Sequence, residues 1–331
     1  MPIIDMHAHV TPERYKAAIR TKGHWHGLDD RPGELDRGGF ANPISQRLAE
    51  MDELGVDMQL VTPTVGFYQY DNALETTKRI HRECNDEIAE LVEAHPTRFA
   101  GLAMVPMQDP ASAIAEMERA MTTMAMKGVV ISDHVGDRTY DQPEFLPFFR
   151  AAEELGAILF FHQGGGDTCV SDRISRFGLP NAVGNLAERT LAYATLVFSG
   201  VIDRHPGLKP LLAHGGGYVP YGVARMDKIA GAFEGAPDGR LTPPFGGTDF
   251  RQQGPPSDYL DRFHYDCCTY SGPVLRFLID TVGIDQVVLG TDYPAPMFLT
   301  DAVNWIRGLP ELTDGEKQAI LETNPTALLD M

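Results

Sequence analysis

The sequence predicts a single α/β domain, a (β/α)8 TIM barrel with loop insertions at its catalytic face, and three observations favour this fold. A length of 331 residues suits one barrel of this kind. Eight short apolar runs recur along the chain, and each is followed by a segment with apolar residues at helical spacing. The sequence shows no repeat of fixed length and no low-complexity tract. We therefore interpret residues 1–331 as one barrel domain.

The predicted strands are continuous apolar runs and do not alternate apolar with polar residues. Such runs are typical of parallel strands that are covered on both faces. In chain order they span residues 3–6, 58–62, 99–105, 128–131, 157–161, 208–213, 263–266 and 286–290.

A predicted helix follows each strand, which completes the alternation of a (β/α)8 barrel. The longest of these helices is followed by Pro96, as expected at a helix stop. The helices span residues 43–54, 73–94, 112–124, 143–155, 186–198, 219–232, 273–282 and 300–306, and an extra helix is expected over 313–322.

Two segments interrupt the alternation of strands and helices in the predicted barrel. Residues 20–41 are rich in Gly, Asp and Arg, and residues 235–257 are rich in Pro and Gly. We interpret both as long loops over the active-site face, where such insertions usually carry specificity.

The composition excludes several classes of protein. A formal net charge of −18 argues against nucleic acid or an anionic membrane surface as a partner, although a few arginines can still bind an anionic substrate locally. There is no apolar stretch of about 18 residues, as a membrane helix needs, and no pattern of a secretory signal, so we expect a cytoplasmic protein. The four cysteines form no CxxC pair, which argues against a zinc ribbon or a thioredoxin-like site.

Five polar residues lie at the ends of predicted strands. His7 and His9 follow the first strand, His162 the fifth, His214 the sixth, and Asp292 the last. Residues two apart in a strand face the same way, so both histidines of the His-x-His pair point to one place. Because the carboxyl ends of barrel strands meet at the catalytic face, we expect all five side chains to converge there.

These residue types suit a catalytic metal site. Imidazole and carboxylate groups are ligands for zinc, manganese or iron, and the set does not distinguish among the three. A metal-bound water would be acidic enough to ionise near pH ~7. His214 can accept or deliver a proton in the same range.

Several other histidines and Asp266 need not contact the metal or the substrate. His24 and His26 form a second His-x-His in the first insertion and have a lower chance of touching substrate. His134 follows the fourth strand and is a candidate for the shell around the metal ligands, and Asp266 either orients a catalytic histidine or is a structural carboxylate. His81 is expected on a helix surface.

Gly215 to Gly217 follow His214 and suggest a close approach of the backbone to a ligand or an anion.

The chain resembles the amidohydrolase superfamily, and within it the branch that contains α-amino-β-carboxymuconate-ε-semialdehyde decarboxylase. The resemblance covers nearly the whole chain. It rests on DMHAH at 5–9, RLAEMDELGVD at 47–57, RFAGLAMVPMQDP at 98–110, FFHQ at 160–163, LLAHGGGYVPYGVAR at 211–225 and VVLGTDYPAP at 287–296.

The resemblance implies roles for individual residues. His7, His9, His162 and Asp292 would be the metal ligands, with His214, Asp292 and Arg47 in catalysis. Arg47 would bind a substrate carboxylate, with a surface ion pair as the alternative. Arg225 would reach the active site of a neighbouring subunit, which implies a homodimer.

Two departures from relatives are informative. The fifth strand carries no lysine, whereas binuclear members of the superfamily typically use a carboxylated lysine there, so a single metal ion is favoured. Gln163 and Gly164 stand where the muconate semialdehyde enzymes have proline and tryptophan, which implies a pocket of different shape.

We therefore expect a metal-dependent, non-oxidative decarboxylase of an aromatic or conjugated unsaturated carboxylic acid. One divalent ion is expected, zinc first and manganese or iron as alternatives, with no organic cofactor. A metal-dependent hydrolase or hydratase acting on an amide, lactone or unsaturated acid is the alternative, since a metal-bound hydroxide serves either reaction. A passive binder of metal or carboxylate is a third hypothesis, disfavoured by His214.

Overall fold

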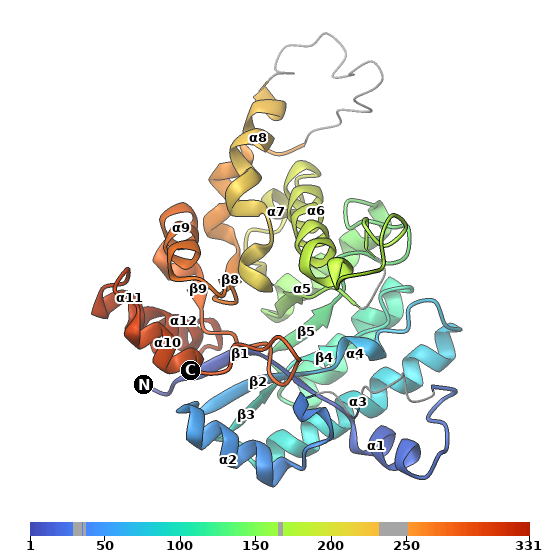
Figure 1. The fold of residues 1–331 in the computed structure, drawn as a ribbon. Helices are drawn as coiled ribbons and strands as arrows, with labels where there is room; N and C mark the ends of the chain where they lie inside the picture. The colour runs from blue at the N-terminus through green and yellow to red at the C-terminus, as the bar shows by residue number, and fades with distance from the viewer. Residues whose placement is uncertain (29–34, 36–37, 165–167, 232–250) are drawn as a thin grey trace.

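Parallel strands form the centre of the molecule, and helices surround them (Figure 1). The computed structural model describes residues 1–28, 35, 38–164, 168–231 and 251–331. The strands are β1 (Ile4–Val10), β2 (Met58–Pro63), β3 (Phe99–Gly101), β4 (Ala103–Met104), β5 (Gly128–Ile131), β6 (Ile158–Phe161), β7 (Lys209–Leu212), β8 (His264–Asp266) and β9 (Val287–Val288).

The strands follow one another in chain order around a (β/α)8 barrel. Hydrogen-bonded neighbours run β1-β2-β3 and then β4 to β9, all of them parallel. Only Leu102 separates β3 from β4, and its N–H donates to the carbonyl of Val61 over 2.9 Å. The N–H of Met6 donates to the carbonyl of Leu289 over 2.8 Å, which links the first strand to the last. The predicted fold class is confirmed.

The helices lie outside the strands. They are α1 (Glu13–Arg20), α2 (Ile44–Leu54), α3 (Leu74–Ala94), α4 (Pro110–Thr123), α5 (Leu146–Leu155), α6 (Leu186–Phe198), α7 (Val201–Arg204), α8 (Val219–Gly231), α9 (Gly272–Val282), α10 (Ala302–Gly308), α11 (Asp314–Gln318) and α12 (Asn324–Leu328). Every predicted helix appears within a few residues. The short helices α1, α7 and α12 were not predicted, because segments of four to eight residues carry little periodicity.

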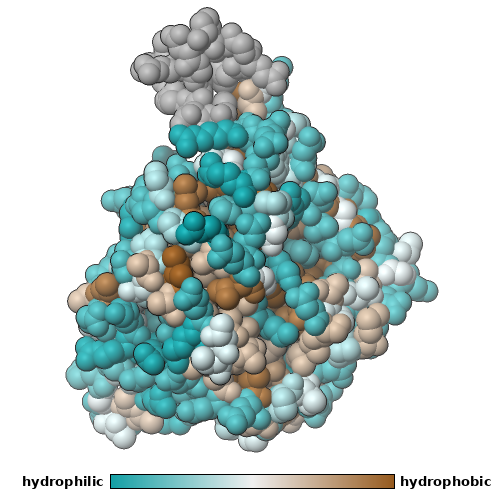
Figure 2. Space-filling model, turned by 180° about the vertical axis from the view of Figure 1, so that it is seen from behind, coloured by the Kyte–Doolittle hydropathy of each residue, from teal (hydrophilic) through white to brown (hydrophobic). Residues whose placement is uncertain are grey.

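Apolar side chains pack in two layers. Leu60, Val130 and Phe160 belong to a cluster on one face of the strands, and the residues that follow each of them in sequence belong to a second cluster with helix residues on the other face. Both faces of each strand are thus buried, which explains the continuous apolar runs. On the opposite side of the molecule from Figure 1, hydrophilic side chains cover most of the surface and hydrophobic ones are interspersed (Figure 2). Among the described residues, no helix combines the length and apolarity needed to span a membrane.

Strand β1 is longer than the sequence predicted. It was expected to end at residue 6, but pairing with β2 continues to Val10, with a register shift between Asp5 and Ala8. His7 and His9 therefore lie inside the strand and not after it. Two polar residues in a buried strand interrupt an apolar run and conceal its true end.

The two predicted insertions are described only in part. Residues 29–34 and 36–37 of the first, and 232–250 of the second, lie outside the described residues. In the first, Trp25 is buried and stacks edge-on against Tyr15 and Phe67, with ring centroids 6.0 and 5.5 Å away. This part of the loop is therefore anchored to α1 and to the segment that follows β2.

Candidate metal centre

Four metal-binding side chains meet at the carboxyl end of the barrel. His7 and His9 come from β1, His162 follows β6, and Asp292 follows β9. One ligand atom of each lies within 4.8 Å of the others, and all four residues are buried. The Oδ1 atom of Asp292 is 3.2 Å from Nε2 of His7, 3.1 Å from Nε2 of His9 and 3.9 Å from Nε2 of His162. The structure thus brings together the four residues that the sequence singled out.

The other ring nitrogen of each histidine is held by the protein. Nδ1 of His7 lies 2.6 Å from Asp266 Oδ2, Nδ1 of His9 lies 3.0 Å from Thr62 Oγ1, and Nδ1 of His162 lies 3.1 Å from the carbonyl of Gln163. Donation from Nδ1 leaves the lone pair of Nε2 directed at the common centre. The sequence left the role of Asp266 open, and the structure pairs it with His7 and not with His214.

The buried carboxylates Asp292 and Asp266 attract a positive charge to this centre, which a bound cation would supply in place of a proton on His7. Burial holds the pKa of His9 below its usual value and that of His162 far below it. Burial also disfavours the charged form of His7, but Asp292 and Asp266 outweigh it and raise the pKa of His7 to about 10. Burial opposes ionisation of Asp292 as well, yet His7 and neighbouring histidines hold its pKa well below the ordinary range.

A metal ion fits this donor set. Nε2 of His162 is buried and has no hydrogen-bond partner among the described residues. A buried nitrogen without a partner is costly, and a cation at the centre would satisfy it. Three imidazoles and one carboxylate form a ligand set that zinc or manganese accepts.

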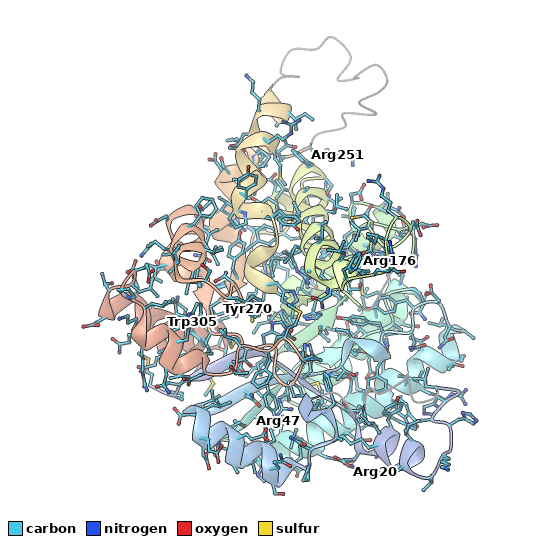
Figure 3. All side chains as sticks on the ribbon, viewed as in Figure 1. Arg20, Arg47, Arg176, Arg251, Tyr270 and Trp305 are labelled. Atoms are coloured by element: carbon cyan, nitrogen blue, oxygen red, sulfur yellow. The ribbon has the colours of Figure 1, made fainter. Side chains whose placement is uncertain are left out.

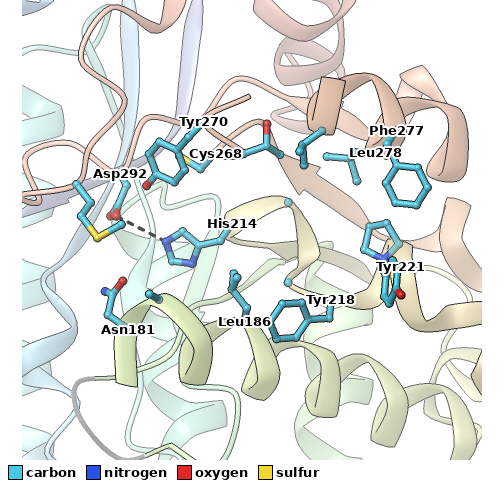
Figure 4. A pocket seen from close by; sticks show the side chains of 17 residues that line it. Asn181, Leu186, His214, Tyr218, Tyr221, Cys268, Tyr270, Phe277, Leu278 and Asp292 are labelled. Carbon is cyan, nitrogen blue, oxygen red and sulfur yellow. Dashed lines mark ion pairs between the residues drawn. The ribbon is translucent and has the colours of Figure 1, made fainter. Parts of the chain in front are cut away.

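His214 lies beside the four ligands without joining them. Its Nε2 is 3.6 Å from Asp292 Oδ2, and its ring centroid is 5.1 Å from that of His162 (Figure 4). It follows β7 in a turn where φ is +56°. His214 is therefore placed to exchange a proton with a molecule held at the centre.

The glycines after His214 are required by the protein itself. A Cβ on Gly217 would lie 2.2 Å from the carbonyl oxygen of Leu186, and one on Gly216 would lie 2.6 Å from the Tyr265 ring. The N–H of Gly215 donates to Asp266. The close approach suggested by the sequence is thus an approach to α6 and β8.

A cavity of about 480 Å³ opens from His214 and Asp292 toward the space between α8 and α9 (Figure 4). Its walls are mainly apolar and aromatic. They are formed by residues of the segments after β6 and β7, of the β8–α9 region and of the segment after β9, namely Ala182, Leu186, Tyr218, Pro220, Tyr221, Tyr270, Val274, Phe277, Leu278 and Met297. Asn181, Cys268 and Thr269 add polar groups. The cavity suits a small molecule with a flat apolar body.

Arg47 does not line this cavity. Figure 3 labels it near α2, whereas the cavity residue Tyr270 lies nearer α9. The buried guanidinium donates from Nη1 to the carbonyl of His9 over 2.6 Å and from Nε to Gln59 over 2.8 Å. It also stacks over the Tyr293 ring at 4.7 Å. Arg47 therefore contacts the barrel wall beside His9. These contacts include no surface ion pair, which was the alternative considered from the sequence.

Arg225 is exposed on α8 and does not line the cavity either. His24 is exposed, and His26 pairs with Glu83 at 3.0 Å, so neither contacts the four-ligand centre. His134 contacts Gln163, the residue after the ligand His162, with 3.1 Å between their side-chain nitrogens.

His81 was expected on the surface and is fully buried. Its Nε2 donates to the carbonyls of Phe67 and Tyr68, at 3.0 and 2.9 Å. The expectation was wrong because a helix position alone does not indicate which face packs against a loop.

Comparisons with known proteins agree with this geometry. The sequence matches the model of the amidohydrolase family over residues 4–331. It is 29% identical over 342 residues to 2-amino-3-carboxymuconate-6-semialdehyde decarboxylase from Dictyostelium discoideum, covering 99% of this chain and 91% of that one. The structure resembles 5-carboxyvanillate decarboxylase from Sphingomonas paucimobilis, with a TM-score of 0.84 and 30% identity over 100% of this chain and 99% of that one.

A third similar protein was solved with a metal. This 5-carboxyvanillate decarboxylase from Novosphingobium aromaticivorans contains manganese and 4-hydroxy-3-methoxy-5-nitrobenzoic acid. It has a TM-score of 0.82 and 23% identity, covering 100% of this chain and 96% of that one, and this likeness supports the fold.

Proposed function

The chain belongs to the amidohydrolase family, and we propose that it is a metal-dependent carboxy-lyase that removes CO2 from an aromatic or conjugated unsaturated carboxylic acid. The observation that carries this proposal is the position of His214. It lies 3.6 Å from the ligand Asp292, at the inner end of a mainly apolar cavity. Decarboxylases of such acids among the similar proteins support the same reaction.

Each part of the site has a task in this reaction. His7, His9, His162 and Asp292 would hold one divalent ion, which supplies a Lewis acid for a substrate oxygen. Leu186, Tyr270 and Leu278 would hold the flat body of the substrate and exclude water. His214 would hold the proton that replaces the carboxylate on carbon, so that one proton is consumed for each CO2 released. No oxidant is needed.

The identity of the ion is a separate proposal. Zinc is the ion first expected from the ligand types, and the similar enzyme from Novosphingobium aromaticivorans holds manganese. Because three imidazoles and a carboxylate accept either ion, metal analysis of the purified protein must distinguish them. We propose one ion per chain.

We also propose a homodimer in which α8 faces the partner. Arg225 and Tyr221 are exposed on this helix, and Tyr221 is 85% exposed although it is aromatic. Val274 and Phe277 of α9 expose apolar surface beside it. Arg225 does not line its own cavity, so it would contribute to a site only in the partner subunit. If so, mixed dimers of Arg225→Ala and His214→Ala chains will regain activity that neither variant has alone.

The decisive experiment measures CO2 release from metal-analysed protein. The substrates are hydroxybenzoates, aminobenzoates and carboxymuconate-type acids. CO2 from one class, lost on chelation, restored by metal and lost in His214→Ala, supports the decarboxylase. His205→Ala is the control, since His205 pairs with Glu153 outside the four-ligand centre. Products that have gained water without CO2 would instead indicate a hydratase or hydrolase, and tight binding without turnover would indicate a passive binder.

A further inference from the structure

A buried ion pair lies behind the turn that carries His214. Nη1 of Arg189, on α6, is 2.5 Å from Oδ1 of Asp133, which follows β5. Both side chains have no exposed surface. Neither residue lines the cavity, and the reaction described above uses neither of them.

Arg189 is joined to the His214 turn by one hydrogen bond, and its side chain also packs close to the end of the turn. Its Nε donates over 3.3 Å to the carbonyl of Ala213, the residue before His214. Its Cβ stands 3.0 Å from the point where a Cβ on Gly217 would lie. Arg189 thus bonds the beginning of the turn and leaves no room for a side chain at its end.

The turn needs such support because its backbone is unusual. His214 has a φ of +56°, and the three glycines that follow have φ values of +61°, +75° and +64°. A residue with a side chain rarely adopts this conformation, and it persists only where its surroundings hold it. Arg189 bonds the carbonyl before His214, and Asp266 bonds the N–H after it.

The ring of His214 stands edge-on to the rings of His7 and His162, with centroids 5.4 and 5.1 Å away, and has few polar contacts. Its Nδ1 is buried and has no hydrogen-bond partner among the described residues. Its Nε2 faces Asp292 at 3.6 Å, which is beyond a strong hydrogen bond. The direction of the imidazole therefore depends on these two ring contacts and on the backbone that Arg189 and Asp266 hold.

The ion pair between Arg189 and Asp133 fixes the orientation of the guanidinium. A buried ion pair often adds no more stability than apolar side chains of the same size. A guanidinium, however, bonds a carboxylate at one nitrogen and a carbonyl at another in a fixed plane. Asp133 orients the guanidinium, and the guanidinium in turn orients the carbonyl of Ala213.

We propose that Arg189 and Asp133 are positioning residues for the reaction, which act through Ala213 to hold the imidazole of His214 at the metal centre. This inference rests on the proposed function of His214. The pair would set the rate of proton delivery and would leave metal binding and substrate binding nearly unchanged.

Two variants test the proposal. Arg189→Lys keeps a charge beside Asp133 but has no second nitrogen that could bond the carbonyl of Ala213 at the same time. The double variant Arg189→Met/Asp133→Leu replaces the pair by apolar groups of similar size. In each, we expect kcat for CO2 release to fall at least about tenfold, with KM and metal content within about twofold of the parent. Arg119→Met is the control, because Arg119 pairs with Asp86 on the outer helices.

Coupling to His214 separates positioning from general damage. If Arg189 acts through His214, adding Arg189→Lys will lower the residual CO2 release of His214→Ala, followed at high protein concentration, only slightly. A cost that adds fully in that background, or an unchanged kcat in both variants, overturns the proposal. Should the double variant fail to fold, Arg189→Lys alone decides.

A spectroscopic measurement covers the case in which the parent releases no CO2. Imidazole resonances of His214, assigned by their loss in His214→Ala, are recorded in the metal-loaded parent and in Arg189→Lys. A changed His214 shift and titration midpoint, with the other histidines unchanged, supports positioning even if the proposed reaction is wrong. Identical His214 resonances in both proteins overturn it.

Discussion

The carboxylate of Asp266 lies 2.6 Å from Nδ1 of His7, and both side chains are fully buried. Its other oxygen, Oδ1, accepts the N–H of Gly215 over 2.9 Å. One carboxylate therefore orients a candidate metal ligand and fixes the backbone next to His214. The metal centre and the proton-handling residue are mechanically joined at this point.

Replacing Asp266 by Asn is expected to weaken metal binding by about 10- to 100-fold, the usual effect of losing a carboxylate that orients a histidine ligand. Competition with a chelator at fixed pH measures the affinity. Asp280→Asn, at an exposed pair with Arg276 on α9, serves as the control. Equal affinities of Asp266→Asn and the parent protein would show that His7 needs no such orientation.

Arg47→Met distinguishes two roles for this arginine. If Arg47 supports the wall beside His9, metal affinity will drop and the protein will lose about 2 to 4 kcal/mol of stability, because the carbonyl of His9 and Gln59 lose a buried partner. If it binds a substrate carboxylate, as the family resemblance implies, KM will rise while metal affinity is kept. Chelator competition, urea unfolding and steady-state kinetics separate these outcomes.

Gly217→Ala is expected to destabilise the protein by more than about 2 kcal/mol. The new Cβ would meet the carbonyl of Leu186 at 2.2 Å, and φ is +64°. Gly222→Ala in α8 is the matched control, since nothing lies within 4 Å of its Cβ position. That change should leave stability equal or raise it by up to about 1 kcal/mol. Urea midpoints that fall equally in both variants would contradict the steric argument.

We expect the buried imidazole of His81 to lower the free energy of unfolding in acid. Burial lowers the pKa of its imidazole to about 4 in the folded protein, against 6.5 in an unfolded chain. Between these values the unfolded chain binds a proton that the folded one does not, so the free energy of unfolding falls as pH decreases from 6.5 to 4. The slope from one such group is up to roughly 1.4 kcal/mol per pH unit.

Urea unfolding of the parent and of His81→Gln at about pH 7, 6 and 5 measures this contribution, because this series starts above the unfolded pKa of 6.5 and enters the window that ends at about 4. Gln keeps an N–H donor for the carbonyls of Phe67 and Tyr68 but does not titrate. The stability of the parent should therefore decline more steeply toward acid than that of the variant. Parallel curves would show that His81 is protonated in the folded protein as easily as in the unfolded chain.

Individual strands and helices show how much of the secondary structure the spacing of apolar residues predicted. The apolar runs located the strands because both faces of a barrel strand are buried. Their bounds were wrong where polar residues interrupt a strand, as at His7 and His9 in β1, and where the run over 99–105 divides into β3 and β4 at Leu102. Long amphipathic segments such as α3 were equally visible, whereas the four residues of α7 were not.

The sequence by itself determined the barrel and the meeting of His7, His9, His162, His214 and Asp292, because each of these follows from a short local pattern and from the common direction of parallel strands. Only the tertiary structure decided which side chains support these five residues from behind. The pairing of Asp266 with His7 joins residues 259 positions apart, and that of Arg189 with Asp133 joins residues 56 positions apart. Such contacts depend on how helices pack around the barrel, and no periodicity within one segment encodes that packing.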